Sequence, residues 1–181
     1  MGRGKRRQII VYIATSADGF IARRDGSVDW LERPRPKGNY GIATFFRSID
    51  TILWGRKTYE FALKHGGSGV GTRIENYVFS HRRLPPKPGW NYVKEPIRLF
   101  AERLRSKAGK DIWIMGGAGL IGSFLDAGQI DEFIIHVIPV FIGEGIPLIH
   151  PRRRHAALQL KSSRRFSDGV VRLHYAVKPG R

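Results

Sequence analysis

Residues 111–122 read DIWIMGGAGLIG. The apolar first half predicts a buried strand, and residues 120–127 predict the helix that follows it. The glycines between the two spell G-x-G-x-x-G at Gly117, Gly119 and Gly122. A glycine turn that leads from a strand into a helix lets backbone N–H groups approach a phosphate at the positive end of the helix dipole. Glycines also close ordinary strand-to-helix turns, so this stretch predicts a nucleotide cofactor only together with other evidence.

Strand and helix patterns alternate on both sides of this turn. Helical spacing predicts helices at residues 40–47, 57–64 and 96–107, and apolar runs predict strands at residues 9–15, 51–54, 76–79, 91–94, 133–138, 157–165 and 170–177. Ser167-Asp168-Gly169 is a hairpin turn signal between the last two strands. The alternation predicts an α/β fold with a mainly parallel sheet and an antiparallel C-terminal hairpin. Without a repeat or a linker, residues 1–181 are expected to form one domain, with a basic, flexible arm at residues 1–7.

The composition excludes several classes of site. The chain has 181 residues and no cysteine, which rules out disulfides, zinc–thiolate sites and thiol nucleophiles, and fits a reducing cytoplasm. His150 and His155 have no third ligand near them in the sequence, so no metal site is expected and both are interpreted as surface residues. The apolar runs are far shorter than the roughly 20 residues that span a bilayer.

The chain is strongly basic, with a formal net charge of +17. Such a charge favours anionic ligands, which include nucleotide phosphates, acidic small molecules and nucleic acid. Most of the excess arginines lie outside any motif and suit a solvated surface. The glycine-rich residues 66–71 lack a preceding strand and a following Gly-Lys-Ser/Thr, so they are interpreted as a flexible loop.

Two further polar groups follow predicted strands. Residues 55–58 read GRKT and offer two cations, a hydroxyl and a helix N-terminus, which suits a phosphate. A basic first turn opposes the helix dipole, and this mild cost favours a functional reason. Residues 80–82 read SHR and repeat the pattern at the next strand end, which favours NADPH over NADH. An ordinary Rossmann domain carries its glycine turn in the first βαβ unit, whereas this turn lies late in the chain, so that fold is not expected. Without a Rossmann turn, the third glycine of the pattern, Gly122, is interpreted as a position where the helix packs closely.

Five motifs occur in an order and at a spacing that give the chain a resemblance to a known family. They are ATSADGFIA at 14–22, DTILWGRKTYE at 50–60, VFS at 78–80, MGGAG at 115–119, and the stretch from IDE at 130–132 through Pro139 to GEG at 143–145. Over residues 9–177 the chain resembles the dihydrofolate reductase-like superfamily, in the branch that includes the reductase (RibD C-terminal) domain of bacterial riboflavin biosynthesis. The resemblance implies a dihydrofolate reductase-like three-layer fold. It also makes a homodimer an expectation, because relatives often pair through sheet edges and C-terminal hairpins.

The same resemblance implies an NADPH-dependent reductase and assigns roles position by position. Basic and hydroxyl residues would hold the phosphates, the glycines would let the cofactor pass close to the sheet, and the end of the first strand would border the nicotinamide. The cofactor residues carried over are Ala14, Gly19, Ile21, Gly55, Arg56, Lys57, Thr58, Ser80, His81, Arg82, Met115, Gly116, Gly117, Ala118, Gly119, Leu120 and Ile121. The residues expected around the substrate are Trp30, Tyr40, Phe45 and Gly143. The proton would come from water, Asp18 or Glu144, although both acids also suit structural roles in their loops.

The chain departs from folate reductases where these carry an acidic residue that binds the pterin. The corresponding residues 40–46 read YGIATFF, so dihydrofolate is not the expected substrate. The function expected is hydride transfer from NADPH to a C=N or C=O bond of a small polar substrate. Two alternatives stay open. One is reduction of the riboflavin-precursor aminopyrimidine ribosyl phosphate, and the other is nucleic-acid binding by an arginine face that joins the N-terminal arm to Arg152, Arg153 and Arg154.

Overall fold

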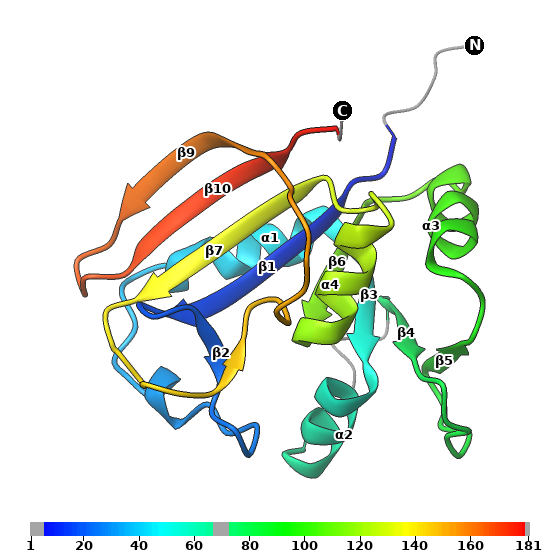
Figure 1. The fold of residues 1–181 in the computed structure, drawn as a ribbon, viewed down its shortest axis with the longest axis horizontal. Helices are drawn as coiled ribbons and strands as arrows, with labels where there is room; N and C mark the ends of the chain where they lie inside the picture. Colours follow the sequence, from blue (N-terminus) through cyan, green and yellow to red (C-terminus); the bar gives the residue numbers. More distant parts are fainter. Residues whose placement is uncertain (1–5, 67–72, 180–181) are drawn as a thin grey trace.

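A computed structural model describes residues 6–66 and 73–179 of the chain. Its main sheet has eight strands in the order β5-β4-β3-β6-β1-β7-β10-β9, and β2 and β8 form a second, two-stranded sheet (Figure 1). The strands are β1 (Ile9–Ser16), β2 (Phe20–Ala22), β3 (Ile49–Gly55), β4 (Glu75–Phe79), β5 (Trp90–Val93), β6 (Asp111–Gly116), β7 (Glu132–Ile138), β8 (Ile146–Pro147), β9 (Leu158–Arg165) and β10 (Val171–Val177). The helices are η1 (Asp29–Leu31), η2 (Asn39–Gly41), α1 (Ile42–Ser48), α2 (Arg56–Lys64), α3 (Ile97–Ser106) and α4 (Ala118–Asp126).

The directions of the strands confirm the expected sheet. From β5 to β7 all neighbours run parallel, while β10 is antiparallel to β7 and β9 is antiparallel to β10. Strand β1 lies between β6 and β7, and its side chains are buried on both faces. This is why residues 9–14 form an almost continuous apolar run instead of an alternating one.

Helices cover both faces of the sheet and enclose two cores, which gives the three layers (Figure 1). On the face covered by α3 and α4, Val11, Phe100 and Phe124 are fully buried. On the opposite face, Ile10 and Tyr12 of β1 pack with residues of α1 and α2. Successive residues of β1 therefore point to opposite layers, as the pleat of a strand requires.

The structure corrects the expected helix at residues 40–47. Helix α1 begins only at Ile42, because residues 38–41 form a left-handed turn with φ of +82°, +43°, +59° and +84°. Gly38 and Gly41 adopt this conformation without a steric penalty, which the helical spacing of the apolar residues did not reveal. The pairing of β2 with β8 was also not predicted, since two- and three-residue strands leave no periodic signal.

The expected flexible arm at residues 1–7 is wrong for Arg7. Its side chain is only 4% exposed and donates hydrogen bonds to Lys110 O at 2.6 Å and Thr51 Oγ1 at 2.7 Å, and it pairs with Asp50. Arg7 is therefore an anchor for the start of β1. Residues 1–5 lie outside the described part of the chain, as do residues 67–71 of the expected glycine loop. None of the helices described has the length and apolar content needed to cross a membrane.

Candidate active site

The carboxyl ends of the parallel strands bring the predicted groups to one edge of the sheet. Strands β4, β3, β6, β1 and β7 are neighbours in this order. Their ends carry residues 80–82, residues 55–58, the glycine turn at 116–119 and residues 14–19. Ligands of open α/β sheets gather at this edge, and the sequence predictions from separate parts of the chain meet there.

Gly55 at the end of β3 lies directly against the glycine turn that follows β6. A Cβ atom on Gly55 would lie 3.1 Å from Gly117 N and 3.2 Å from Gly116 O. A Cβ atom on Gly117 would lie 3.2 Å from the Thr58 hydroxyl oxygen. The Gly116–Gly117 peptide bond is cis. The built Cβ contacts favour glycine at positions 55 and 117, because a side chain there would press on the neighbouring turn, which a G-x-G pattern alone does not show.

Two helices begin at this contact. Gly55 is the N-cap of α2 and Gly117 is the N-cap of α4, and neither has a side chain that can accept from the first N–H groups of its helix. Two helix N-termini thus lie at neighbouring strand ends with donors that need a partner. The positive ends of both helix dipoles favour an anion at this edge.

The basic residues predicted to hold phosphates lie at the surface of this edge. Arg56 Nη1 donates to both carboxylate oxygens of Glu60 at 2.7 Å, and Lys57 is exposed. At the end of β4 the Ser80 hydroxyl accepts the Arg82 N–H at 3.0 Å, which fixes the turn and leaves the Arg82 side chain exposed. His81 is exposed beside it.

Two predicted cofactor residues have buried side chains, and their role stays a prediction. Ile121 is 0% exposed and Leu120 is 8% exposed, and both belong to the core beneath α4. Their side chains pack against the sheet, so a contact with a ligand at its edge would have to come from their backbone. Ala118 is also buried, whereas Met115 is half-buried and Gly119 is exposed. Gly122 packs closely on the segment before β9, since a Cβ atom there would lie 3.2 Å from Arg154 Nη2.

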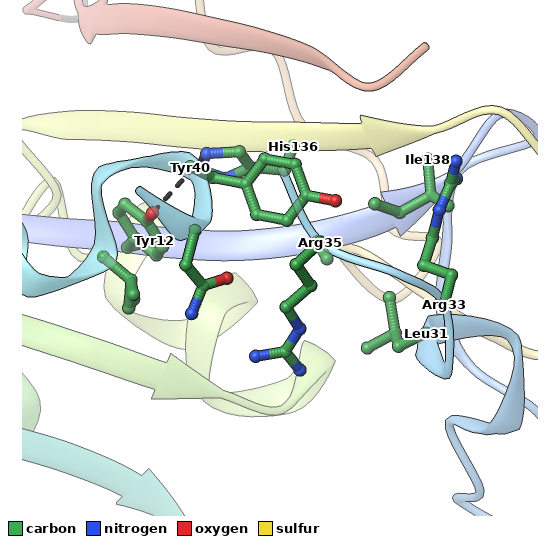
Figure 2. Close-up of a pocket in the computed structure, with 10 residues that line it drawn as sticks. Tyr12, Leu31, Arg33, Arg35, Tyr40, His136 and Ile138 are labelled. Carbon is green, nitrogen blue, oxygen red and sulfur yellow. Dashed lines mark hydrogen bonds between the residues drawn. The ribbon is translucent and has the colours of Figure 1, made fainter. Parts of the chain in front are cut away.

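A pocket of about 170 Å³ opens beside this edge, on the α1 side of β1 and β7 (Figure 2). Of the predicted residues, Ala14 and Tyr40 line it. The full lining is Tyr12, Ala14, Leu31, Arg33, Arg35, Asn39, Tyr40, Ile42, His136 and Ile138. The pocket is thus mainly aromatic and aliphatic, and its lining includes two arginines and no carboxylate.

Tyr12 and His136 form the part of the wall that lies on the sheet. The Tyr12 ring stacks on Phe45 with centroids 4.2 Å apart, and its hydroxyl lies 3.5 Å from His136 Nε2 (Figure 2). Burial raises the pKa of Tyr12 to about 12, against a smaller opposing effect of Arg172. Burial and the nearby Arg172 lower the pKa of His136 to about 4. At neutral pH the phenol is therefore protonated and the imidazole is neutral.

The other residues expected around the substrate lie behind the pocket or away from it. Trp30 is 9% exposed and packs with Ile138 and Val170. Within the described residues, its buried indole N–H has no hydrogen-bond partner. Phe45 supports the Tyr12 ring from behind. Gly143 lies in the loop after β7, where its N–H donates to Asp18 at 2.8 Å.

Asp18 and Glu144 make loop contacts and do not line the pocket. Asp18 accepts hydrogen bonds from the Ser16 hydroxyl and from the N–H groups of Ile142 and Gly143, and the Ser16 bond contributes most to lowering its pKa. It therefore joins the loop after β1 to the loop after β7. Glu144 pairs with the exposed Arg24 at 2.7 Å.

Gly19 and Ile21 lie in the segment just after Asp18. Gly19 has a φ of +87° and its N–H donates to Ser16 O at 3.0 Å, which closes the turn after β1. Ile21 lies in β2 and is half-buried. Both residues are near the end of β1 in the chain, but neither is part of the pocket lining.

The arrangement agrees with comparisons to known proteins. Residues 95–172 match the model of the RibD C-terminal domain family. The uncharacterized protein YwjB of Bacillus subtilis is 38% identical over 178 residues, which cover 93% of this chain and 97% of YwjB.

Solved structures show the same fold. A Shewanella sp. PV-4 protein assigned to riboflavin biosynthesis has a TM-score of 0.84 at 26% identity, and the match covers 95% of this chain and 99% of the other. The diaminohydroxyphosphoribosylaminopyrimidine deaminase/5-amino-6-(5-phosphoribosylamino)uracil reductase of Thermotoga maritima has a TM-score of 0.71 at 16% identity. In that case the match covers 96% of this chain and 57% of the other. The chain therefore belongs to the RibD C-terminal domain family, a branch of the dihydrofolate reductase-like superfamily.

Proposed function

We propose that the protein is an NADPH-dependent reductase that transfers a hydride to a C=N or C=O bond of a small polar substrate. One observation carries this proposal. Along the carboxyl edge of the sheet, the cationic start of α2 lies at β3, the glycine contact lies between β3 and β6, and the pocket begins at Ala14 of β1. Phosphate anchors at one end and a pocket at the other suit a long dinucleotide whose reactive ring meets a substrate.

The residues of this edge fit such a cofactor. Arg56, Lys57 and Thr58, with Ser80 and Arg82, would hold its phosphates, and the glycine cradle at residues 116–119 leaves room for its backbone, because no side chain projects from three of these four positions. Ala14 would border its reactive ring at the mouth of the pocket. When bound, NADPH supplies the hydride, and the protein supplies orientation and exclusion of water.

The pocket also limits the source of the proton. Asp18 and Glu144 are engaged in loop contacts and do not line the pocket, so neither is proposed as the donor. Among the side chains that line the pocket, the Tyr40 hydroxyl donates to Asp168. The Tyr12 hydroxyl lies on the pocket wall, but burial raises its pKa to about 12 and makes it a weak acid, so we propose a water molecule as the proton donor.

The riboflavin precursor remains the specific alternative substrate. Arg33 and Arg35 both line the pocket, and although Arg33 pairs with Asp168 behind the lining, the lining itself carries two cations and no carboxylate, which favours an anionic substrate such as an aminopyrimidine ribosyl phosphate. Turnover of that compound with NADPH would decide between it and other carbonyls or imines. Nucleic-acid binding is less favoured, because Arg152 and Arg154 of the expected arginine face pair with Asp126.

Titration with NADPH and NADH, followed by fluorescence, tests the cofactor assignment. The variant Arg56→Gln is expected to bind NADPH roughly tenfold more weakly, since it loses a charged hydrogen bond to the adenosine 2′-phosphate, while binding of NADH, which lacks that phosphate, changes little. Arg98→Gln is a matched control, because Arg98 faces Glu102 in the same i,i+4 arrangement on α3. If the unaltered protein does not bind NADPH at near-millimolar concentration, the reductase proposal is wrong.

A further inference from the structure

One side of the pocket is made by residues 33–41, which we call the strap. It contributes Arg33, Arg35, Asn39 and Tyr40 to the lining. Figure 2 shows Arg33, Arg35 and Tyr40 of the strap beside the lining residues that come from strands β1 and β7, among them Tyr12, His136 and Ile138. The width of the pocket therefore depends on where the strap is held.

The strap ends in a left-handed backbone conformation that Gly38, Asn39 and Gly41 tolerate and Tyr40 does not favour. Asn39 and Tyr40 have φ of +43° and +59°, between two glycines that are also left-handed. Left-handed residues normally occur singly, and a bulky residue such as tyrosine pays a steric cost there. Such conformations persist where surrounding contacts hold them, and they are frequent at ligand-binding sites.

The contacts that hold the strap converge on Asp168, in the turn between β9 and β10. The Tyr40 hydroxyl donates to Asp168 Oδ2, and Arg33 Nη2 donates to Asp168 O at 2.6 Å. The Arg33 Nε atom also lies 3.7 Å from Asp168 Oδ2, and the Asp168 side chain is only 15% exposed. One residue of the hairpin thus binds both ends of the strap.

Packing fixes the Tyr40 ring in the same position. Its centroid lies 5.1 Å from that of Phe166, in an edge-on arrangement, and 5.8 Å from that of His136. Burial raises the pKa of Tyr40, and the hydrogen bond to Asp168 raises it further. The same hydrogen bond is the main cause that lowers the pKa of Asp168. The phenol therefore keeps its proton and the carboxylate keeps its charge at neutral pH.

We propose that Asp168 is a positioning residue of the pocket, which holds Tyr40 and Arg33 in the conformation that forms the pocket wall and so limits which substrates enter. The proposal rests on the proposed function only for the identity of the occupant. If Asp168 only stabilised the hairpin, its carboxylate would not be needed by the strap. The proposed role requires this carboxylate to accept the hydrogen bond of the Tyr40 hydroxyl and so to hold the strap in place.

Two measurements on Asp168→Ala, Asp168→Asn and Tyr40→Phe test this. Hydrogen exchange of the strap amides is expected to rise tenfold to a hundredfold in Asp168→Ala, about what the loss of a charged hydrogen bond produces. Asp168→Asn, which still accepts from Tyr40, is expected to show a smaller rise. In protein labelled with 3-fluorotyrosine, the pKa of Tyr40 is expected to fall in both Asp168 variants, with the Tyr40 signal assigned by its loss in Tyr40→Phe.

Asp25→Asn is the matched control, because Asp25 is an exposed turn residue that accepts the Ser27 N–H at 2.9 Å. Unchanged strap exchange and an unchanged Tyr40 pKa in the Asp168 variants would overturn the proposal. If hydrogen exchange in β1 and β6 rises as much as in the strap, Asp168→Ala has destabilised the whole protein. Tyr40→Phe then tests the proposal, since it removes only a hydroxyl and must still raise hydrogen exchange in the strap. NADPH binding is measured on the unaltered protein alongside, so a failure to bind NADPH at all counts against the reductase and leaves the strap result standing.

Discussion

At Gly55 the absence of a side chain decides how close two strand ends come. Gly55→Ala places a methyl group 3.1–3.2 Å from the backbone of the glycine turn, where neither neighbour is a flexible side chain. The free energy of unfolding is expected to fall by about 1–3 kcal/mol, and NADPH binding is expected to weaken with it.

Gly119→Ala is the control for this change. A Cβ atom there would meet only His150 Cδ2 at 3.8 Å, an ordinary contact. Because Gly119 lies inside α4, the added methyl group is expected to stabilise the protein by up to about 1 kcal/mol. Urea denaturation of both variants measures the contrast, and equal effects would contradict the role given to Gly55.

His136 predicts a pH dependence with a defined direction. The unfolded chain takes up this proton near the ordinary pKa of 6.5, and the folded chain takes it up near 4. Between these values the unfolded state binds more protons, so the free energy of unfolding falls as the pH falls, by about 3 kcal/mol in total. Denaturation at pH 7 and pH 4.5 is expected to show this loss in the unaltered protein and a smaller one in His136→Gln. A titration by NMR that gives a pKa near 6.5 would contradict it.

Some site residues could be predicted from the sequence and others could not. Gly55 and the turn at residues 116–119 carry local signals, because strand ends and glycines mark backbone geometry directly. Tyr12, His136, Arg33 and Arg35 were missed. Tyr12 and His136 are polar residues within apolar strands, and only the three-dimensional arrangement shows that both face the α1 side, where a pocket opens.

At the scale of elements, the start of β1 is held in place by Arg7, which was expected from the sequence to belong to a flexible basic arm. Arg7 bridges Asp50, Thr51 and the backbone at Lys110 while almost fully buried. Arg7→Ala is expected to lower the free energy of unfolding by about 2–3 kcal/mol, because it removes the buried cation that pairs with Asp50 and donates to Lys110 O, although Asp50 keeps its hydrogen bond from the Lys110 N–H. Thermal or chemical unfolding measures the change.

Arg6→Ala is the matched control for the arm. The Arg6 side chain is 65% exposed and lies 3.6 Å from Asp131, so its removal is expected to matter by less than about 0.5 kcal/mol. Equal losses in the two variants would show that general charge, and not the buried network of Arg7, stabilises this edge of the sheet.

For the molecule as a whole, the direction of the strands and the layers could be predicted from the sequence. Alternating strands and helices predicted a mainly parallel sheet, the hairpin signal predicted its antiparallel end, and the family resemblance implied three layers; these are confirmed, whereas the order of the strands was not predicted. The strap and the small β2–β8 sheet could not be predicted, because they depend on contacts between residues more than a hundred positions apart.

Strand β9 lies at the edge of the sheet with every residue exposed (Figure 1). Leu158 and Leu160 are 42% and 53% exposed and lie on one face of the strand. An exposed edge with apolar residues favours pairing with a second copy, so the homodimer stays a prediction. Sedimentation velocity is expected to show a dimer for the unaltered protein and a monomer for Leu160→Lys, and a monomer in both cases would refute it.

The hydrogen bond between Tyr40 and Asp168 joins residues 128 positions apart in the chain. During synthesis the strap leaves the ribosome long before the hairpin that holds it. The pocket wall therefore cannot take its final shape until β9 and β10 have been made, although β1, β3 and β6 are already available to pair. A nascent chain that stops before the hairpin is expected to carry the cofactor edge without a finished pocket, so that cofactor binding matures earlier than substrate selection.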